Sequence, residues 1–188
     1  HRIAMLTSFL LSSAWVAAET PLVRGSTPVA TVVTAAKPTA VAAYAAKELV
    51  DHVERATGVR LPICPETSPQ AVTGTRVYIG PSDAATAAGV VAGRDPVEGC
   101  VLRTVEDALF VIGDDDDTDP LKMSTRAGTL WGVYELLETE LGVRWIWPGE
   151  AGIVVPNVKS VAISPQNREF SPWLIRRNLR PGLGLRGN

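Results

Sequence analysis

The stretch TRAGTLWGVYELLETELGVRWIW, residues 125–147, decides the fold of this chain. Five of its apolar or aromatic residues recur at helical spacing along one stripe: Leu130, Val133, Tyr134, Leu137 and Leu141. This stripe predicts an amphipathic helix from Thr125 to Leu141, with Gly142 as its left-handed cap. The β-branched and aromatic residues from Val143 to Trp147 predict a strand, which Pro148 stops. The stretch therefore predicts a helix that returns directly into a sheet.

A second strand and helix precede this stretch in the sequence. Pro28 to Thr34 is β-branched and short, which predicts a strand. From Thr39 to Thr57 apolar residues recur every three or four positions, and charged residues fill the other face. Gly58 stands at the position of a left-handed C-terminal cap. A strand followed by an amphipathic helix is typical of a layered fold.

The remaining segments predict a mixed sheet. Strands are expected at Val59–Ile63 (an edge strand, because Pro62 lacks a donor), Arg76–Gly80 and Val158–Ile163, with a hairpin over Gly99–Gly113 and a short helix from Ser82 to Ala88. Hairpins together with helical crossovers indicate an α+β fold, an α/β sandwich in which two main helices pack on one face of a mixed sheet.

The ends of the chain carry their own signals. His1 and Arg2 give a positive start, an apolar run follows, and Val16-Ala17-Ala18 offers a cleavage site, which predicts a signal peptide over 1–18. The run is shorter than the ~20 residues of a membrane span. We therefore expect a secreted or periplasmic protein with no membrane segment after cleavage. Residues 19–27 are interpreted as a lead-in, 28–165 as the domain and 166–188 as a linker.

Composition excludes some partners and leaves one question open. A net charge of −2 provides no basic footprint for nucleic acid. Cys64 and Cys100 are the only cysteines, and their number and spacing match neither a disulfide framework nor a metal site. In an exported protein they could form one disulfide; two buried free thiols are the alternative. We expect no cofactor.

Three motifs are interpreted as structural or coincidental. Asp115, Asp117 and Asp119 match the first ligand positions of a calcium loop, but Pro120 and Arg126 stand where that loop needs glycine and glutamate. A solvated loop beside a helix N-terminus is favoured. His52 is interpreted as structural or solvated, which excludes a zinc site or a histidine-based triad. The glycine spacing of a dinucleotide loop recurs at Gly182, Gly184 and Gly187 without the strand and helix it requires.

Aromatic and acidic residues supply the binding candidates. Trp145 and Trp147 share one face of their expected strand, where their rings could stack on a sugar, with Arg144 as a hydrogen-bond donor. Packing of the pair beneath a helix is the favoured alternative. Glu150 follows in a Pro-Gly-Glu loop and is the most suggestive carboxylate. The carboxylates of the long helix, Glu135, Glu138 and Glu140, are interpreted as its solvated face.

A family resemblance covers roughly residues 29–163. The run GTLWGVYELLETELGVRWIWPGEAGIVVP, residues 128–156, resembles the accessory domain that precedes the catalytic barrel in exported bacterial glycoside hydrolases. It is similar to the N-terminal domain of alpha-glucuronidases and to the second domain of beta-N-acetylhexosaminidases. AAKELVDHVERATGVRLPI and RVYIG fit the same pattern. SPWLIRRN, residues 171–178, looks like the linker that enters such a barrel.

The resemblance implies an accessory role. It implies a domain without catalytic residues, whose partner is the C-terminal barrel of a parent O-glycosyl hydrolase. The alternatives are a free-standing module that binds an oligo- or polysaccharide through Trp145, Trp147 and Arg144, and a purely structural domain of an exported protein. Exposed tryptophans would favour sugar binding. A buried pair with an apolar patch near Pro172 would favour docking to a barrel.

Overall fold

The computed structural model describes residues 19–68, 71–92 and 98–171. The expected signal peptide, the glycine spacing at 182–187 and nearly all of the expected linker into a barrel lie outside these residues. In chain order the elements are β1 Thr20–Arg24, β2 Thr27–Pro28, β3 Ala30–Thr34, α1 Ala40–Thr57, β4 Ile63–Pro65, β5 Thr75–Ile79, α2 Asp83–Ala87, β6 Cys100–Val105, β7 Ala108–Gly113, α3 Gly128–Thr139, β8 Arg144–Trp145, a 3-10 turn Glu150–Gly152, β9 Ile153–Val154, β10 Val161–Ile163 and β11 Asn167–Phe170.

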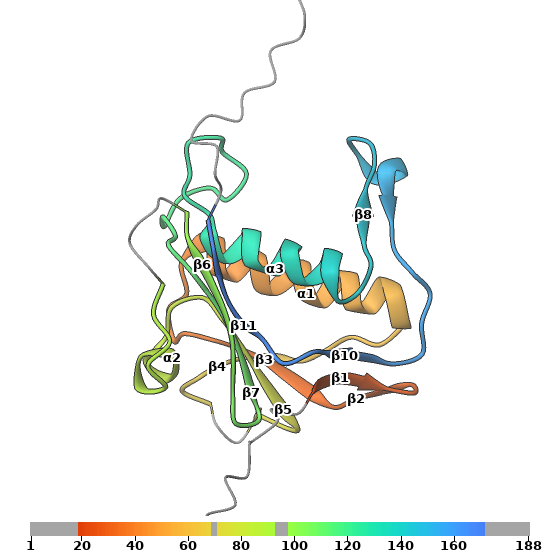
Figure 1. Ribbon diagram of the computed structural model, residues 1–188, viewed down its shortest axis with the longest axis horizontal. Helices are drawn as coiled ribbons and strands as arrows, with labels where there is room; N and C mark the ends of the chain where they lie inside the picture. Colours follow the sequence, from red (N-terminus) through yellow and green to blue (C-terminus); the bar gives the residue numbers. More distant parts are fainter. Residues whose placement is uncertain (1–18, 69–70, 93–97, 172–188) are drawn as a thin grey trace, which may run out of the picture.

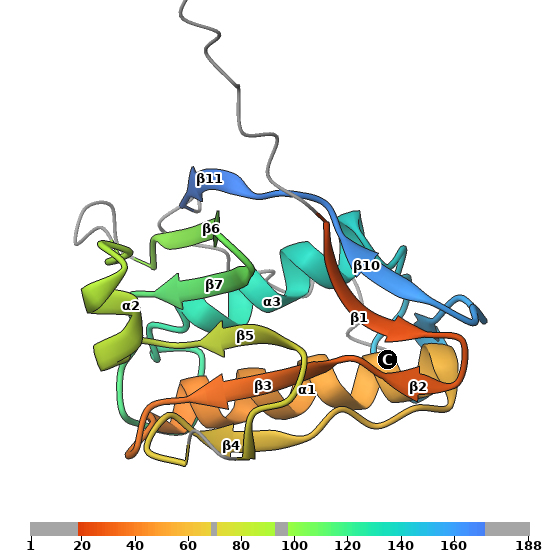
Figure 2. The same cartoon turned by 90° about the horizontal axis from the view of Figure 1, so that it is seen from below.

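The main sheet has six strands in the order β11-β6-β7-β5-β3-β4 (Figure 2). Strands β7, β5, β3 and β4 run parallel, whereas β6 and β11 are antiparallel to their neighbours. A smaller antiparallel sheet, β10-β1-β2, lies beside it, and β8 and β9 form a separate two-stranded hairpin. The expected α+β class with a mixed sheet is confirmed.

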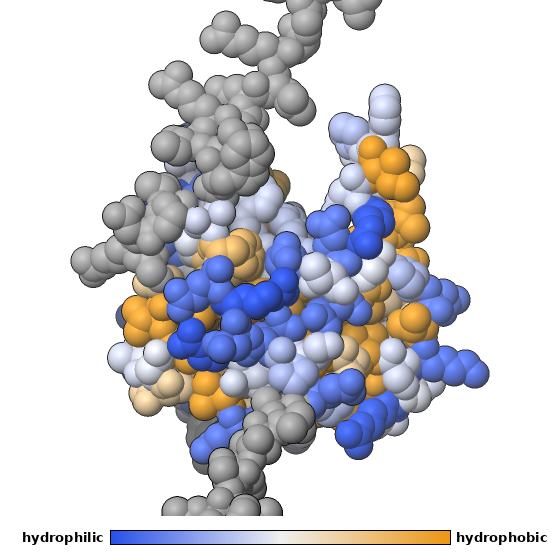
Figure 3. Space-filling model, viewed as in Figure 1, coloured by the Kyte–Doolittle hydropathy of each residue, from blue (hydrophilic) through white to orange (hydrophobic). Residues whose placement is uncertain are grey.

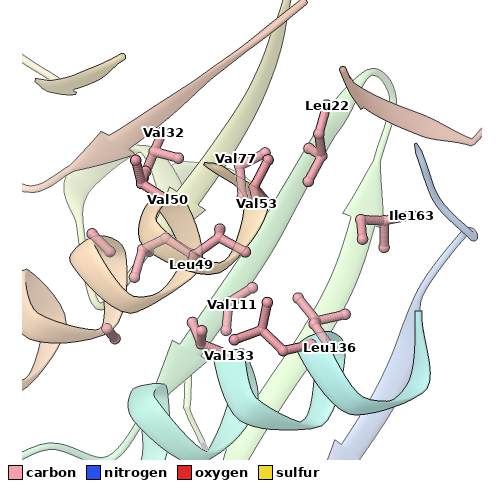
Figure 4. Close-up of a cluster of buried hydrophobic side chains, with 14 of the residues drawn as sticks. Leu22, Val32, Leu49, Val50, Val53, Val77, Val111, Val133, Leu136 and Ile163 are labelled. Carbon is pink, nitrogen blue, oxygen red and sulfur yellow. The ribbon is translucent and has the colours of Figure 1, made fainter. Parts of the chain in front are cut away.

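Helices α1 and α3 lie side by side on one face of the main sheet (Figures 1 and 2). Apolar side chains of α1, including Leu49 and Val53, point towards Val77 of β5, and Val133 of α3 lies near Val111 of β7 (Figure 4). The other face has a smaller apolar cluster under α2, to which Phe110 of β7 belongs. Because side chains alternate along a strand, β7 serves both cores and is buried throughout.

Both ends of α1 are capped, and the cap at Gly58 is the one that the sequence predicts. The Thr39 hydroxyl accepts a hydrogen bond from the amide of Ala42 at 3.0 Å. At the other end Gly58 has a φ of 73°, and its amide donates to the carbonyl of Glu54. A residue with a Cβ is disfavoured in this left-handed conformation.

Helix α3 is shorter than the helix expected over Thr125–Leu141. Its first expected turn is occupied by a bridge between Asp115 and Ala127, so that the helix begins at Gly128. Here α3 starts against the end of β7: a Cβ on Gly113 would lie 1.9 Å from the amide nitrogen of Thr129. Glycine is therefore required where these two elements meet.

Two expected boundaries are wrong. The lead-in expected over residues 19–27 contains β1, where Leu22 and Val23 are buried and pair the segment with β10. The linker expected from residue 166 begins with β11, which pairs with β6 and extends the main sheet. Both strands are short, and β10 and β6, with which they pair, lie far away in the sequence; the local partner of β1 is only the two-residue β2.

Three expected strands are shifted or shortened. The edge strand expected over Val59–Ile63 lies instead at Ile63–Pro65. The segment before it leaves the end of α1 and buries the side chains of Val59 and Leu61 in the core. The strand expected over Val143–Trp147 pairs only at Arg144 and Trp145, and its partner is β9 rather than the main sheet. The strand expected from residue 158 begins at Val161.

The possible disulfide is not formed. Cys64 and Cys100 are both free and buried. Cys64 lies on β4 and Cys100 on β6, with three strands between them, so about four strand spacings of ~4.8 Å separate them. A disulfide requires Cα atoms within ~7 Å. The two buried free thiols are therefore the correct alternative, and burial raises the pKa of the Cys100 thiol far above its ordinary value.

Candidate functional site

The most prominent apolar surface belongs to the β8–β9 hairpin and its turn, residues 144–154. The hairpin rises near the C-terminal ends of α1 and α3, on the side of the helices away from the main sheet (Figure 1). The side chains of Ile146 and Trp147 are 72% and 74% exposed, and Val154 is 49% exposed. Hydrophobic atoms accordingly gather on this projection (Figure 3). Exposed apolar residues grouped in this way mark an interaction surface more often than scattered ones do.

A concavity of about 510 Å³, the hairpin groove, lies within this projection. It is lined by Trp145, Ile146, Trp147, Pro148, Gly149, Glu150 and Ile153. The structure thus brings together three of the four residues expected to contact a sugar. The favoured expectation that both tryptophans pack beneath a helix is wrong for Trp147, because the short hairpin carries this ring away from the core. Glu150 lies 3.2 Å from Arg55 of α1 across an exposed ion pair.

Arg144 lies outside this groove. Its Nη1 donates to the backbone carbonyl of Glu138 at 2.7 Å and to that of Val143 at 2.8 Å. The Glu138 carbonyl belongs to the last turn of α3, where backbone acceptors lack an intrahelical partner and a cation is favourable. The structure therefore assigns Arg144 a capping role, which corrects its expected place beside the tryptophans.

A second concavity of about 470 Å³, the helix groove, lies between α3 and the hairpin. Its lining residues come from α3, β8 and the end of β11: Trp131, Tyr134, Glu135, Glu138, Trp145, Phe170 and Ser171. The sequence analysis did not assign Trp131 or Tyr134 to a site. The spacing 131, 134, 135 and 138 places these residues on one helix face, which is the signal that could have found them.

Trp145 forms the wall shared by the two grooves. Its ring centroid lies 5.1 Å from that of Tyr134 and 5.6 Å from that of His52, at interplanar angles of 63° and 57°. Trp131 extends the aromatic row, with its centroid 6.2 Å from that of Tyr134. Edge-to-face pairs of this kind hold the rings in place. Although 39% of Trp145 is exposed, the ring contacts with Tyr134 and His52 fix its orientation.

Polar groups support this aromatic row from below. The Tyr134 hydroxyl donates to Glu48 Oε2 at 3.2 Å, and burial raises the pKa of Tyr134 well above its ordinary value. His52 Nδ1 lies 2.9 Å from the carbonyl oxygen of Glu48. His52 is buried on α1, and its Nε2 has no hydrogen-bond partner among the described residues. The structural role expected for His52 agrees with this packing.

Two carboxylates line the helix groove, and one of them is paired with an arginine. Glu135 Oε1 accepts a hydrogen bond from Arg168 Nη1 at 3.0 Å. The carboxylate of Glu138 has no partner within the described parts of the chain. Glu140, outside the groove, accepts from the Ser164 amide and the Gln166 side chain, which ties the start of β11 to α3. No lysine or arginine is among the residues that line the groove.

The aspartate run, residues 114–117, lies at the N-terminal ends of α1 and α3. Asp115 accepts hydrogen bonds from the amide and the hydroxyl of Thr129 at the start of α3, and Asp117 accepts from the amide of Ala40 at the start of α1. Asp114 and Asp116 pair with Arg126. Within the described ranges no group of three or more His, Cys, Asp or Glu side chains could hold a metal ion. The expected position of these charges beside a helix N-terminus is confirmed, whereas the expected solvation is wrong for Asp115, which is partly buried.

Comparisons with known proteins assign no family to this chain. Among the described residues no helix is both long and apolar enough to cross a membrane. A scan against protein-family models and a search of the curated proteins both find no match for this chain.

Proposed function

We propose that this chain is the accessory domain of an exported glycoside-hydrolase-like protein, of the type that resembles the second domain of beta-N-acetylhexosaminidases. The sequence resemblance over residues 29–163 supports the proposal, as does a mixed sheet with two main helices on one face. In this proposal residues 1–18 are a signal peptide, and catalysis belongs to a barrel in a longer polypeptide.

The observation that carries the proposal is the exposed apolar hairpin. Ile146 and Val154 are aliphatic, and aliphatic side chains suit contact with another protein surface better than contact with sugar hydroxyls. Phe170 and Ser171 line the neighbouring helix groove, so the chain passes this surface at the point where it continues towards residue 188. A following domain would therefore meet the hairpin.

The test compares this chain with a longer polypeptide that includes the following domain. We expect aryl glycosides or glucuronoxylan oligomers to be hydrolysed by the longer polypeptide and not by this chain. Hydrolysis by this chain alone would overturn the accessory role. Glu150 and Glu135 would then be the first carboxylates to substitute.

The hairpin contact is tested by substitution within the longer polypeptide. The double variant I146S/W147S should lower the melting temperature of the longer polypeptide by several degrees while leaving the melting temperature of the isolated domain nearly unchanged. Leu121→Ser is the matched control, because Leu121 is 69% exposed in the loop before α3. Equal shifts in both polypeptides would contradict docking.

Direct carbohydrate binding is a second candidate, favoured by one observation. Trp145 and Trp147 line a single concavity together with the Glu150 carboxylate, and ring faces of this kind can stack on the apolar face of a pyranose. Affinity electrophoresis in polysaccharide gels tests it, with Trp147→Ala expected to abolish retardation. Equal mobility of both proteins in every gel would remove this candidate.

A further inference from the structure

We propose that the helix groove is a binding site for an amino sugar that carries a free ammonium group. The site differs from the residues expected to contact sugar, since it uses Trp131, Tyr134 and Glu138 of α3 together with Trp145. The choice of a sugar among ammonium compounds rests on the proposed carbohydrate function. The choice of the ammonium group rests on the groove itself.

The aromatic walls are arranged before any ligand arrives. Trp131 and Trp145 are 38% and 39% exposed, so each ring offers an accessible surface. Tyr134 lies between them and contacts both, while its hydroxyl is held by Glu48. Binding to walls already ordered by packing costs less side-chain entropy than binding to mobile side chains. The groove is therefore suited to stacking.

The charged residues that line the groove favour a positively charged ligand. Its lining residues include two carboxylates and no cation, and Arg168 already neutralises Glu135. Glu138 remains as an exposed carboxylate without a described partner. An ammonium group can pair with this carboxylate and also lie against an indole ring, an attraction that is strongest for tryptophan. A uronic acid would instead be repelled.

The volume of the groove fits a small saccharide. About 470 Å³ lies within the ~300–1,000 Å³ that is common for small-molecule sites. A pyranose presents axial hydrogens to a ring face and hydroxyls or an ammonium group at its edge. This combination matches aromatic walls with a carboxylate at the rim. The ligand class is thus a short oligosaccharide of unsubstituted amino sugars.

The test is a titration of this chain, followed by tryptophan fluorescence and calorimetry, with four trisaccharide probes. Glucosamine trisaccharide should bind more tightly than its N-acetylated form and than cellotriose, and a uronic acid trisaccharide should not bind measurably. Affinity for the glucosamine probe should fall as salt is raised, because the pairing with Glu138 is screened. Equal affinity for the glucosamine and N-acetylated probes would overturn the proposal.

Matched variants locate the site. Glu138→Gln should weaken binding of the glucosamine probe by about 1.5- to fivefold, the range expected for loss of one exposed ion pair. Glu19→Gln removes the same charge outside the groove and should leave the affinity unchanged. Trp131→Ala should weaken binding further, and its thermal unfolding must match that of the wild type. An unaltered affinity in Glu138→Gln would also overturn the proposal.

Choline chloride and a lysine-rich peptide serve as probes that carry an ammonium group without a sugar. Binding of either probe without binding of the glucosamine trisaccharide would overturn the choice of a sugar. The accessory role has separate readouts, namely hydrolysis by the longer polypeptide and the melting temperatures of the hairpin variants. A failure of the amino-sugar site is therefore distinguishable from a failure of the accessory role.

Discussion

At the residue scale, Asp115 is a partly buried carboxylate whose pKa departs from the ordinary aspartate value. Burial raises its pKa from the ordinary aspartate value to about 6, and hydrogen bonds from Thr129 only partly offset this effect. A carboxylate in this position caps the N-terminus of α3 at the cost of losing water. The residue therefore links the charge state of the loop to the stability of the fold.

The raised pKa predicts the sign of one pH effect. Because folded Asp115 binds its proton more tightly than the unfolded chain does, its contribution to stability is greatest below the unfolded pKa and declines as pH rises through about 6. A shift of two pKa units corresponds to about 3 kcal/mol, which partial exposure reduces to roughly 1–3 kcal/mol. Asp115→Asn should remove this component. Urea unfolding of both proteins from pH 4.5 to 7.5 measures it, and equal slopes would refute it.

A second residue-scale prediction concerns Tyr134. Its hydroxyl donates to Glu48 beneath the aromatic row, and Tyr134→Phe deletes this donor while preserving the ring. We expect a loss of about 1 kcal/mol in the free energy of unfolding, the usual cost of one side-chain hydrogen bond. Denaturant unfolding measures the loss. An unchanged unfolding midpoint would mean that water replaces the bond without cost.

At the element scale, the position of α3 depends on Gly132. A Cβ at this position would lie 2.3 Å from Cys100 Sγ and 2.8 Å from Val111 Cγ1. Both neighbours are short, buried side chains on strands and cannot move aside easily. Close approach of α3 to β6 and β7 therefore requires glycine, even though glycine weakens a helix.

Gly132→Ala tests this packing. The expected overpacking cost of ~1–3 kcal/mol is opposed by up to ~1 kcal/mol gained in helix propensity, so the variant should be destabilised overall. Cys100→Ala removes the sulfur that the new methyl group meets, and the double variant should recover part of the loss. A double-mutant cycle of thermal unfolding measures this coupling. Strict additivity of the two substitutions would contradict the proposed clash.

At the scale of the whole molecule, β11 is part of the folded domain. It covers the edge of β6, and Arg168 and Glu169 fix it through ion pairs with Glu135 of α3 and Arg103 of β6. An uncovered strand edge offers unpaired backbone groups to another chain. The domain therefore extends beyond Pro165, the end expected from the sequence.

Two truncations test the role of β11. A chain that ends after Pro165 should melt at a lower temperature than one that ends after Ser171, and it should self-associate through β6. Thermal unfolding and size-exclusion chromatography report the two effects. Identical behaviour of both truncations would place β11 outside the cooperative unit.

Local signals in the sequence predicted much of the fold. The periodicity of α1 and α3, the cap at Gly58, and the hairpin of β6 and β7 depend on neighbours within a few residues, so local patterns predicted them. Strand β11 pairs with β6 and strand β1 with β10, in each case across more than 60 residues, and the only local partner of β1 is the two-residue β2. Their pairing was therefore missed.

The candidate site was predicted only in part, for the same reason. The sequence by itself determined which residue types could bind a sugar, and it singled out Trp145, Trp147 and Glu150. Only the tertiary structure decided that Arg144 caps α3, that Trp147 projects into solvent and that Trp131 shares a groove with Trp145. Side-chain chemistry is a local property, whereas exposure and proximity depend on how α3 and the hairpin pack together.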